Sequence, residues 1–414
     1  MKKLIALLLV LALSLSVVGC SQNTSTTPGS TPGTTNPDGT VGSGAPTSPP
    51  KDPAELHELY KRGSYTGSDA DVLAAHDTVV ATLGDATLTN SMLHFYYWMG
   101  VYDFISNYGS YLSQTGLDIN KSLDAQALTG TDGTWQHYFL DNALGSWRYY
   151  TAMAMECELT GTPISAEYQK NLENFYDELT KTATENGFSS IDAMIQSDMG
   201  IGCTAEDYYT YTEIGHKAHT YFTKLFYEIS FTDEQIEAYF TENEAALAVD
   251  GITKTTGDSY LVRHILFQVA ETKTDADWEE CRQKAENLMN TWLAGDATED
   301  SFAELAKEHS EDPGSQGAGG LYSGLTSQTS FVQEFKDWYL AAGRKPGDYG
   351  LIKTSYGYHI MYFSGTEPIW EFYCREALVD EESAKQVNAI VEKYELVVDY
   401  DKILLGEVKL TEEK

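Results

Sequence analysis

The chain has few cysteines for its 414 residues. Five are present, and no two of them form a Cys-x-x-Cys pair, which argues against a zinc ribbon or a redox dithiol. Cys157 and Cys281 fall at small apolar positions of expected helices, where a free buried cysteine is common. The alternative is a structural disulfide between two of the cysteines, which would require an oxidising environment outside the cytoplasm. The cysteines beyond the N-terminal region are Cys157, Cys203, Cys281 and Cys374.

Positive charge is also scarce. Lys and Arg number 27 against 62 Asp and Glu, so the formal net charge is −35 at pH 7. Such a chain repels phosphate groups. It is therefore not expected to bind nucleic acid, or to adhere to anionic lipid through its own side chains.

Motifs for nucleotides, hydrolysis and metals are missing. No Gly-x-Gly-x-x-Gly follows an expected strand, and neither a P-loop nor Gly-x-Ser-x-Gly occurs. His216 and His219 lie three apart on an expected helix, but no acidic or cysteine ligand completes a metal pattern around them. The sequence therefore predicts neither a metal site nor a cofactor.

The chain begins with an apolar run that is too short to span a membrane. Two lysines precede residues 4–13, which are all apolar, and small residues follow before Cys20. A transmembrane helix needs about 20 apolar residues, so the pattern predicts a cleaved secretion signal over residues 1–19.

Residues 17–20, Val-Val-Gly-Cys, resemble the lipobox of bacterial lipoproteins. That resemblance implies that Cys20 is lipidated and becomes the new N-terminus, since attached acyl chains hold a protein on a bilayer. The alternative is an ordinary secreted protein with a cysteine at its cleavage site. After Cys20 the composition is dominated by Ser, Thr, Pro and Gly, so residues 20–55 are expected to form a disordered tether.

Residues 56–250 read as a mostly helical domain. An alternating run over residues 78–83 and a Gly-Asp turn predict a hairpin that ends at a helix cap near Thr89. Thr134 and Thr232 are the expected caps of two later helices. Apolar periodicity predicts helices from Met92 through Phe104, Trp135 to about Glu158, Ala166 to about Glu185, Ala205 to about Tyr227, and Asp233 to about Leu247.

Tyrosine is abundant in this helical domain and occurs there in adjacent pairs. One interpretation is packing in the core and at its rim. The other is an adaptable aromatic surface for unfolded segments, because tyrosine offers apolar area and a hydroxyl at low entropic cost. The pairs are Tyr96-Tyr97, Tyr149-Tyr150 and Tyr208-Tyr209.

Residues 255–366 follow a different pattern. Residues 258–268 alternate like a strand and contain His264. Three helical stretches come next, interrupted by a Pro-Gly loop after Ser310, and two apolar segments that end near His359 read as strands.

Six short motifs in this region resemble the parvulin rotamase family. They are Arg-His-Ile-Leu, Phe-Ala-Glu-Leu-Ala, Ser-x-Asp-x-Gly-Ser, Gly-Gly-Leu, Lys-Pro-Gly-Asp and Tyr-Gly-Tyr-His-Ile, in this order over roughly 105 residues. The signal, tether and flanking helices make the whole chain similar to extracytoplasmic foldases of the PrsA type, and more distantly to the chaperone SurA. The resemblance implies an α+β fold, with a four-stranded, mainly antiparallel sheet in the parvulin domain.

The resemblance also implies a site. His264 and His359 match the two histidines that face each other across the parvulin sheet within a hydrogen-bonded network. Asp312 matches the position beside the twisted peptide bond of the substrate, which is cysteine or aspartate in parvulins. The apolar pocket for the proline ring is implied at Leu321, Phe331 and Phe335.

These residue types suit prolyl isomerisation. The barrier of about 18 to 20 kcal/mol comes from amide resonance, so no nucleophile, metal or nucleotide is needed. The catalyst must bind the twisted amide better than either planar form. An apolar pocket can fix the proline ring, and a polar network can accommodate the charge redistribution.

Three functions remain as hypotheses. The first is a peptidyl-prolyl isomerase and chaperone for exported polypeptides with Xaa-Pro bonds, anchored by lipid at the outer face of the cell membrane. The second is a non-catalytic holdase, favoured by the departure from the family pattern after Gly320, where Leu321 is followed by Tyr322-Ser323-Gly324-Leu325. A solute-binding lipoprotein is the third. The oligomeric state stays open, a dimer included, and residues 367–414 are expected to pack back on the helical domain.

Overall fold

The computed structural model describes residues 58–270 and 272–410. The predicted signal, the predicted lipidation site Cys20 and the predicted tether lie outside these residues. No helix within the described residues is apolar over a length that would cross a bilayer.

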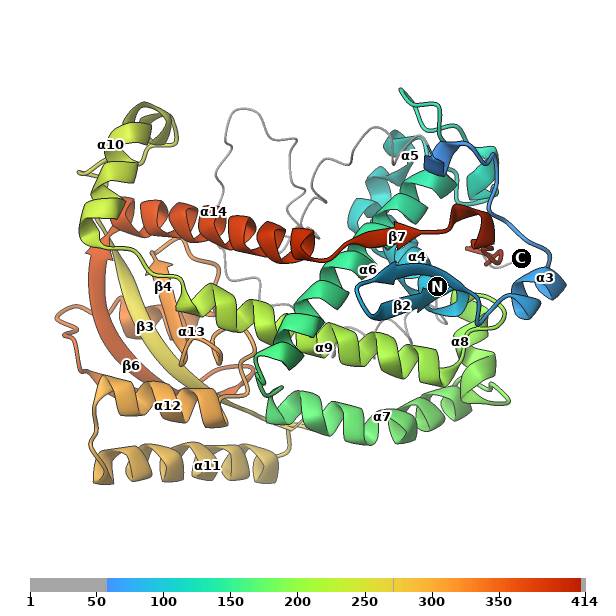
Figure 1. Cartoon of the computed structure of the whole chain (residues 1–414). Helices are drawn as coiled ribbons and strands as arrows, with labels where there is room; N and C mark the ends of the chain where they lie inside the picture. Colours follow the sequence, from blue (N-terminus) through green and yellow to red (C-terminus); the bar gives the residue numbers. More distant parts are fainter. Residues whose placement is uncertain (1–57, 271, 411–414) are drawn as a thin grey trace. The chain divides into compact units, whose positions relative to one another are not determined.

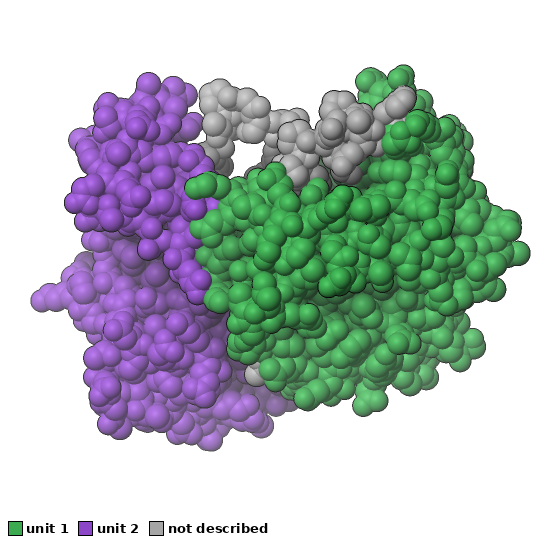
Figure 2. Space-filling view, viewed as in Figure 1, with its two compact units in different colours: residues 1–16, 44–225, 384–414 green, residues 17–43, 226–383 purple. Residues whose placement is uncertain are grey.

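The described chain forms two compact units (Figure 2). The first unit combines residues 58–225 with residues 384–410, and the second consists of residues 226–383. The second unit is therefore an insertion in the sequence of the first unit, and the chain enters and leaves it from the first unit.

The first unit is mostly helical, with one small sheet (Figure 1). Its strands are ordered β2-β1-β7, and both pairings are antiparallel. The elements are α3 (Asp69–Ala74), β1 (Val79–Leu83), β2 (Ala86–Thr89), α4 (Asn90–Tyr108), η1 (Gly109–Tyr111), α5 (Leu112–Thr115), η2 (Leu123–Ala125), α6 (Trp135–Leu159), α7 (Ala166–Glu185), α8 (Ile191–Met199), α9 (Ala205–Glu228), β7 (Leu396–Val398) and η3 (Tyr400–Lys402).

The predicted hairpin and caps are confirmed in this unit. The Thr89 hydroxyl accepts a hydrogen bond from the Met92 amide at the start of α4. Thr134 caps α6 through a reciprocal capping box with His137. Helices α3 and α8 were not predicted from the sequence, and both are short helices capped by serine.

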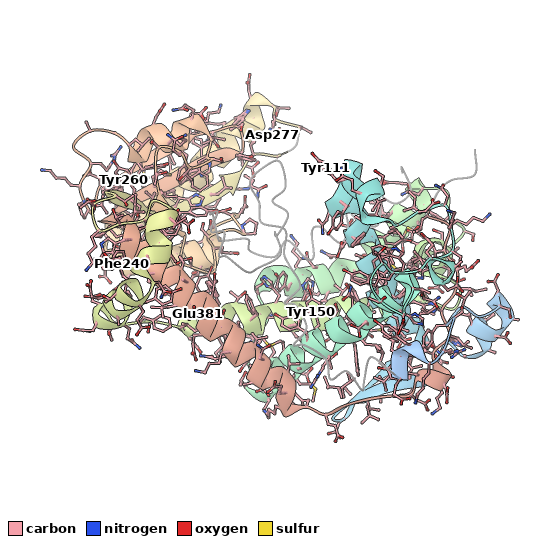
Figure 3. The ribbon with its side chains drawn as sticks, turned by 90° about the horizontal axis from the view of Figure 1, so that it is seen from above. Tyr111, Tyr150, Phe240, Tyr260, Asp277 and Glu381 are labelled. Atoms are coloured by element: carbon pink, nitrogen blue, oxygen red, sulfur yellow. The ribbon has the colours of Figure 1, made fainter. Side chains whose placement is uncertain are left out.

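Helix α4 forms the centre of the first core, because its buried residues occur on every face. The tyrosine pairs divide between the two interpretations. Tyr96, Tyr97 and Tyr208 are buried, whereas Tyr149, Tyr150 and Tyr209 are only partly buried. Tyr150 lies on α6 (Figure 3). Tyrosine therefore supplies both the core of this unit and part of its surface.

Within the first unit, residues 399–406 are held to the N-terminal part by a buried polar side chain as well as by the pairing of β7. The fully buried Asn90 donates through Nδ2 to the carbonyls of Ala75 (3.1 Å) and Lys402 (3.0 Å). Its Oδ1 accepts from the Leu404 amide at 2.9 Å. One side chain thus satisfies three backbone groups that would otherwise be buried without partners.

We predict that Asn90→Ala destabilises the first unit by about 2 to 4 kcal/mol, because buried backbone groups lose their partners. Urea unfolding and protease cleavage within residues 399–406 measure the effect. Asn186→Ala is the matched control, since Asn186 is exposed at the end of α7 and is expected to cost less than about 1 kcal/mol. Equal unfolding midpoints for the two variants would contradict the prediction.

The second unit contains a four-stranded antiparallel sheet in the order β4-β3-β6-β5. The fold is α+β. The elements of this unit are α10 (Asp233–Val249), β3 (Asp258–Gln268), α11 (Asp275–Ala294), α12 (Glu299–His309), β4 (Leu321–Leu325), α13 (Gln333–Tyr339), β5 (Tyr349–Lys353), β6 (Gly357–Pro368) and the first part of α14 (Ile369–Lys393).

The division between the units differs from the domain boundaries expected at residues 250 and 367. Helix α10 and residues 369–383 both belong to the second unit. Phe240 of α10 packs edge-on against Trp370 of α14, with ring centroids 5.0 Å apart, in a shared buried cluster. This contact joins segments far apart in sequence, so local patterns could not reveal it.

The two faces of this sheet carry different layers. Ile265, Ile360 and Tyr362 face the buried side chains of α11 and α12. Val262 and Met361 pack with α13 on the opposite face. Because side chains alternate along a strand, the register of β3 and β6 decides which residues reach each face.

All four cysteines in the described residues are free and buried. A disulfide between any two of them is therefore not part of the structure.

Candidate active site

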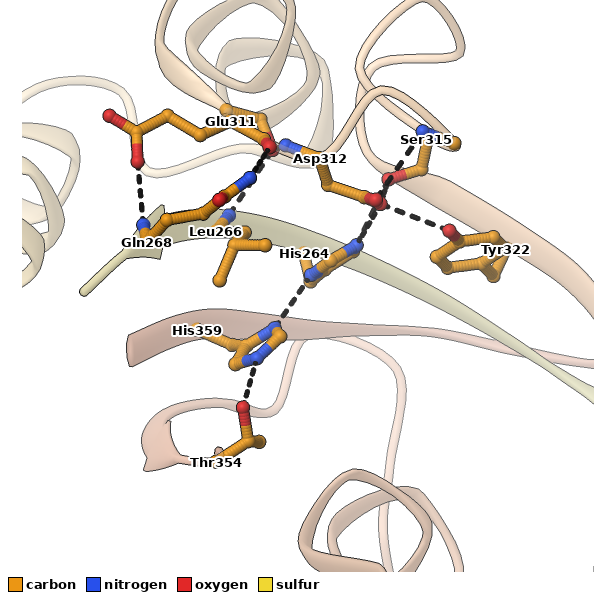
Figure 4. Close-up of polar contacts among 11 residues, drawn as sticks. His264, Leu266, Gln268, Glu311, Asp312, Ser315, Tyr322, Thr354 and His359 are labelled. Atoms are coloured by element: carbon orange, nitrogen blue, oxygen red, sulfur yellow. Dashed lines mark hydrogen bonds and ion pairs between the residues drawn. The ribbon is translucent and has the colours of Figure 1, made fainter. Parts of the chain in front are cut away.

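The two predicted histidines meet on the sheet face on which α13 packs. Figure 4 shows the dashed contact between their rings. In the antiparallel register, His264 of β3 lies opposite Met361, and His359 of β6 lies opposite Leu266. The histidines are therefore diagonal neighbours on one face. Their Nδ1 atoms are 3.0 Å apart, and both side chains are buried.

Asp312 reaches the histidines from the loop that follows α12. Its Oδ2 lies 2.7 Å from His264 Nε2. Several hydrogen bonds fix the loop to β3. Among them, Glu311 N donates to Leu266 O (2.8 Å), and Leu266 N donates to the Ser310 hydroxyl (3.1 Å). Backbone pairing thus sets the position of the carboxylate beside the sheet.

Two hydroxyl groups donate to the same carboxylate oxygen. Ser315 Oγ lies 2.5 Å from Asp312 Oδ2, and Tyr322 Oη lies 3.0 Å from it (Figure 4). Ser315 is fully buried. With His264, three donors therefore converge on one oxygen, as expected for an ionised carboxylate.

The far end of the network fixes the histidine tautomers. His359 Nε2 lies 2.8 Å from the Thr354 hydroxyl, which can donate to it. With neutral rings, His359 Nδ1 then donates to His264 Nδ1, and His264 Nε2 donates to Asp312. Every proton in this assignment is directed toward the carboxylate.

The electrostatics favour an ionised Asp312 and a neutral His359. Burial alone would raise the pKa of Asp312, but the hydrogen bonds from His264, Ser315 and Tyr322 outweigh it and hold the pKa well below its ordinary value. Burial and the nearby His264 lower the pKa of His359 to about 3, so this ring is neutral at pH 7.

Aromatic side chains form the apolar part of the site. The Phe335 ring lies 5.2 Å from that of His264 and 5.7 Å from that of His359. Phe331 lies 4.9 Å from both Phe335 and Tyr322. The predicted Phe331 and Phe335 are thus brought together beside the polar network.

Leu321 does not join this cluster, contrary to the sequence expectation. It lies opposite Arg263 in the register of β3 and β4, whereas Tyr322 lies opposite Val262. Leu321 and Tyr322 therefore face opposite sides of the sheet, and Tyr322 is the residue that reaches the site. The expectation was wrong by one residue, which is enough to change the face.

Comparison with known families identifies this region. Residues 250–365 match the family model of the PPIC-type PPIase domain. This segment contains the whole network described above. Residues 250–365 are a PPIC-type PPIase domain.

The curated relatives of the chain match in the same domain. Chaperone SurA of Pseudomonas fluorescens is 34% identical over 109 residues, which cover 26% of this chain and 23% of the relative. Chaperone SurA of Pseudomonas putida is 36% identical over 112 residues, with the same two shares. The chain thus matches about a quarter of the length of these relatives.

Solved structures with some likeness include PrsA proteins. PrsA from Bacillus subtilis has a TM-score of 0.29 and 18% identity, over 66% of this chain and 93% of that one. PrsA from Bacillus anthracis has a TM-score of 0.20 and 17% identity, over 59% of this chain and 95% of that one.

Sequence reasoning missed three polar members of the PPIase network. Ser315 closes the motif Ser-x-Asp-x-Gly-Ser, so its position in that motif was an available signal. Thr354 gave no comparable signal, because its contact with His359 depends on the turn between β5 and β6. Tyr322 was missed because its neighbour Leu321 was assigned to the face of β4 that carries the site.

The histidine pair of the helical domain has structural contacts. His216 stacks on Tyr168 with ring centroids 4.1 Å apart, and His219 Nδ1 lies 2.9 Å from the Tyr168 hydroxyl. Across the residues that the structure describes, no group of three or more His, Cys, Asp or Glu side chains could hold a metal ion.

The low pKa of His359 predicts a pH-dependent stability of the PPIase domain. An unfolded histidine takes up a proton as the pH falls through about 6.5, whereas the folded ring takes one up only near pH 3. Between these values the unfolded state binds more protons, so stability falls with pH by about 1.4 kcal/mol per unit. Asp312 adds a further loss below its unfolded pKa of about 3.9, because its folded pKa is lowered.

We predict that the free energy of unfolding drops by about 2 kcal/mol more in the wild type than in His359→Gln between pH 7 and pH 5. Urea unfolding of both proteins at the two pH values measures this difference, and other titrating groups cancel in the comparison. Parallel pH dependences would show that His359 is not held neutral by the fold.

Proposed function

We propose that the PPIase domain catalyses cis–trans isomerisation of Xaa-Pro bonds, and that the whole chain assists the folding of exported polypeptides. One observation carries the proposal: a partly buried Asp312 that accepts three hydrogen bonds lies in the same site as the aromatic cluster of Tyr322, Phe331 and Phe335. The site thus combines a fixed negative charge with an apolar surface of suitable type for a proline ring.

The proposed mechanism follows from amide resonance. In the planar amide, resonance places negative charge on the carbonyl oxygen, and twisting removes part of that charge. A fixed carboxylate beside the oxygen raises the energy of the planar forms relative to the twisted one, which lowers the barrier. No bond is formed or broken, so the reaction needs neither a nucleophile nor a proton acceptor.

Each residue has a distinct role in this proposal. Asp312 supplies the charge, and His264 and His359 hold its position and its ionisation through the tautomer chain. Phe331 and Phe335 receive the proline ring, and Tyr322 takes the place that the sequence assigned to Leu321.

Exchange NMR on short Xaa-Pro peptides tests the enzymatic proposal. The chain without residues 1–20 should accelerate isomerisation, and His264→Ala should reduce the acceleration without unfolding the domain. The peptides should differ in the residue that precedes proline. If the folded wild type accelerates isomerisation in none of them, the enzymatic proposal is wrong. The non-catalytic holdase is then the better hypothesis, and suppression of client aggregation is its assay.

The helical unit is proposed to bind unfolded segments of the clients. Tyr149 and Tyr150 offer partly buried rings at its surface, which suit contacts with varied side chains. Replacing both by alanine should weaken suppression of aggregation while leaving peptide isomerisation unchanged. Equal suppression by the variant and the wild type would remove this surface from the proposal.

Location outside the cytoplasmic membrane, on a lipid attached to Cys20, is also proposed. The support is the sequence of residues 1–20. Labelled palmitate should be incorporated into the wild type and not into Cys20→Ala, and the variant should leave the membrane fraction. Incorporation of label into both proteins would refute lipidation at Cys20.

A further inference from the structure

The Tyr322 side chain has contacts that a simple pocket wall does not need. Its ring stacks on His264, with centroids 5.4 Å apart and planes 25° apart, and it meets Phe331 edge-on at 4.9 Å. Its hydroxyl reaches across the site to Asp312 Oδ2 at 3.0 Å. One side chain therefore touches both the apolar surface and the charged centre.

Gly314 leaves room for the Tyr322 hydroxyl. A Cβ at Gly314 would lie 2.6 Å from Tyr322 Oη, closer than carbon and oxygen atoms approach without a bond. The Gly314 amide also donates to Asp312 Oδ1 at 3.3 Å. The loop that carries Asp312 thus provides both the acceptor for the phenol and the space in which it lies.

The strand that carries Tyr322 is fixed from its other side. Gly324, two residues later in β4, has a positive φ of 65°, and a Cβ there would lie 2.3 Å from the Phe372 ring of α14. Close packing of Phe372 on this glycine holds β4 against movement. The Tyr322 phenol is consequently positioned by the fold before any substrate binds.

We propose that Tyr322 is a positioning residue whose hydroxyl fixes the orientation of the Asp312 carboxylate relative to the apolar surface that receives the proline ring. The proposal rests on the isomerase function proposed above. A carboxylate in solution rotates freely, whereas this one is held by His264, Ser315 and Tyr322 at a single oxygen. Only Tyr322 among these donors also belongs to the aromatic surface.

The consequence concerns the transition state more than substrate binding. Tyr322→Phe keeps the ring and its contacts, so the proline ring is bound as before and KM changes little. The carboxylate loses one charge-assisted hydrogen bond, and its position matters most for the twisted amide. A loss in kcat of about 10-fold is expected, since a hydrogen bond to a charged group is worth at least this factor.

Two variants separate the hydroxyl from the ring. Tyr322→Phe removes the donor, and Gly314→Ala displaces it while leaving Tyr322 and Asp312 intact. In both, the pKa of Asp312 should rise, because the ionised form loses a donor. Carbon-detected NMR titration of the Asp312 carboxyl in the chain without residues 1–20 measures this without any activity assay. Tyr349→Phe is the matched control: Tyr349 is exposed on β5 and its ring meets Trp292 on the other face of the sheet.

The outcomes distinguish the two proposals. A raised Asp312 pKa and a kcat loss in Tyr322→Phe and Gly314→Ala, but not in Tyr349→Phe, support the positioning role. An unchanged Asp312 pKa overturns it, whether or not the protein is active. An active wild type in which Tyr322→Phe keeps full kcat also overturns it and leaves the isomerase function standing. A wild type that is inactive on every peptide removes the isomerase function itself.

Discussion

Asp312→Asn is expected to lower kcat for an Xaa-Pro peptide by about 100-fold, the scale of losing one strong electrostatic contact in an active site. The replacement keeps the shape of the side chain and removes its charge. Three donors, from His264, Ser315 and Tyr322, would then compete for one neutral amide oxygen. The field that disfavours the planar amide disappears, so the loss should fall mainly on kcat.

Glu311→Gln is the control for Asp312→Asn, because it removes the same charge at the neighbouring position. The Glu311 carboxylate accepts from the backbone amide of Gln268, away from the histidines, and a glutamine oxygen can accept in its place. This variant should keep activity within about 3-fold of the wild type, as for a surface substitution. If both variants lose activity equally, net charge matters and the position of Asp312 does not.

Helices and caps could be read from the sequence because local physics determines them. The expected bounds of α7 agree with the structure, and Thr89 and Thr134 cap their helices as predicted. The histidine pair and Asp312 were also predictable, since their motifs matched a family and the structure brings all three together. In these cases the information lies within a few residues along the chain.

The missed features depend on contacts between distant segments. The domain boundary expected at residue 367 is one of them, because α14 begins at Ile369 and Trp370 packs there against α10. The error at Leu321 has the same origin. The register of β4 is set by its pairing with β3, and alternation alone cannot tell which of two neighbouring residues faces the site.

Gly320 sets that register, and Gly320→Ala is expected to destabilise the PPIase domain by about 3 to 5 kcal/mol. Gly320 has a φ of 75°, and an added Cβ would lie 2.2 Å from the His264 carbonyl oxygen. Its own carbonyl accepts from the His264 amide at 2.8 Å, and its amide donates to Ser315 O at 2.7 Å. Relieving the clash must therefore move β3 away from the loop that carries Asp312.

Gly343→Ala separates this close contact from backbone strain. Gly343 has a similar φ of 82°, but no atom lies within 4 Å of an added Cβ, so only the left-handed conformation is penalised, by about 1 to 2 kcal/mol. Urea unfolding gives both free energies, and amide hydrogen exchange in β3 reports whether the pairing with Gly320 opens. Similar losses in the two variants would mean that strain dominates. A much larger loss at Gly320, with faster exchange at His264, would show that the glycine is required because the chain passes close enough to β3 to hold the histidine and the carboxylate in one network.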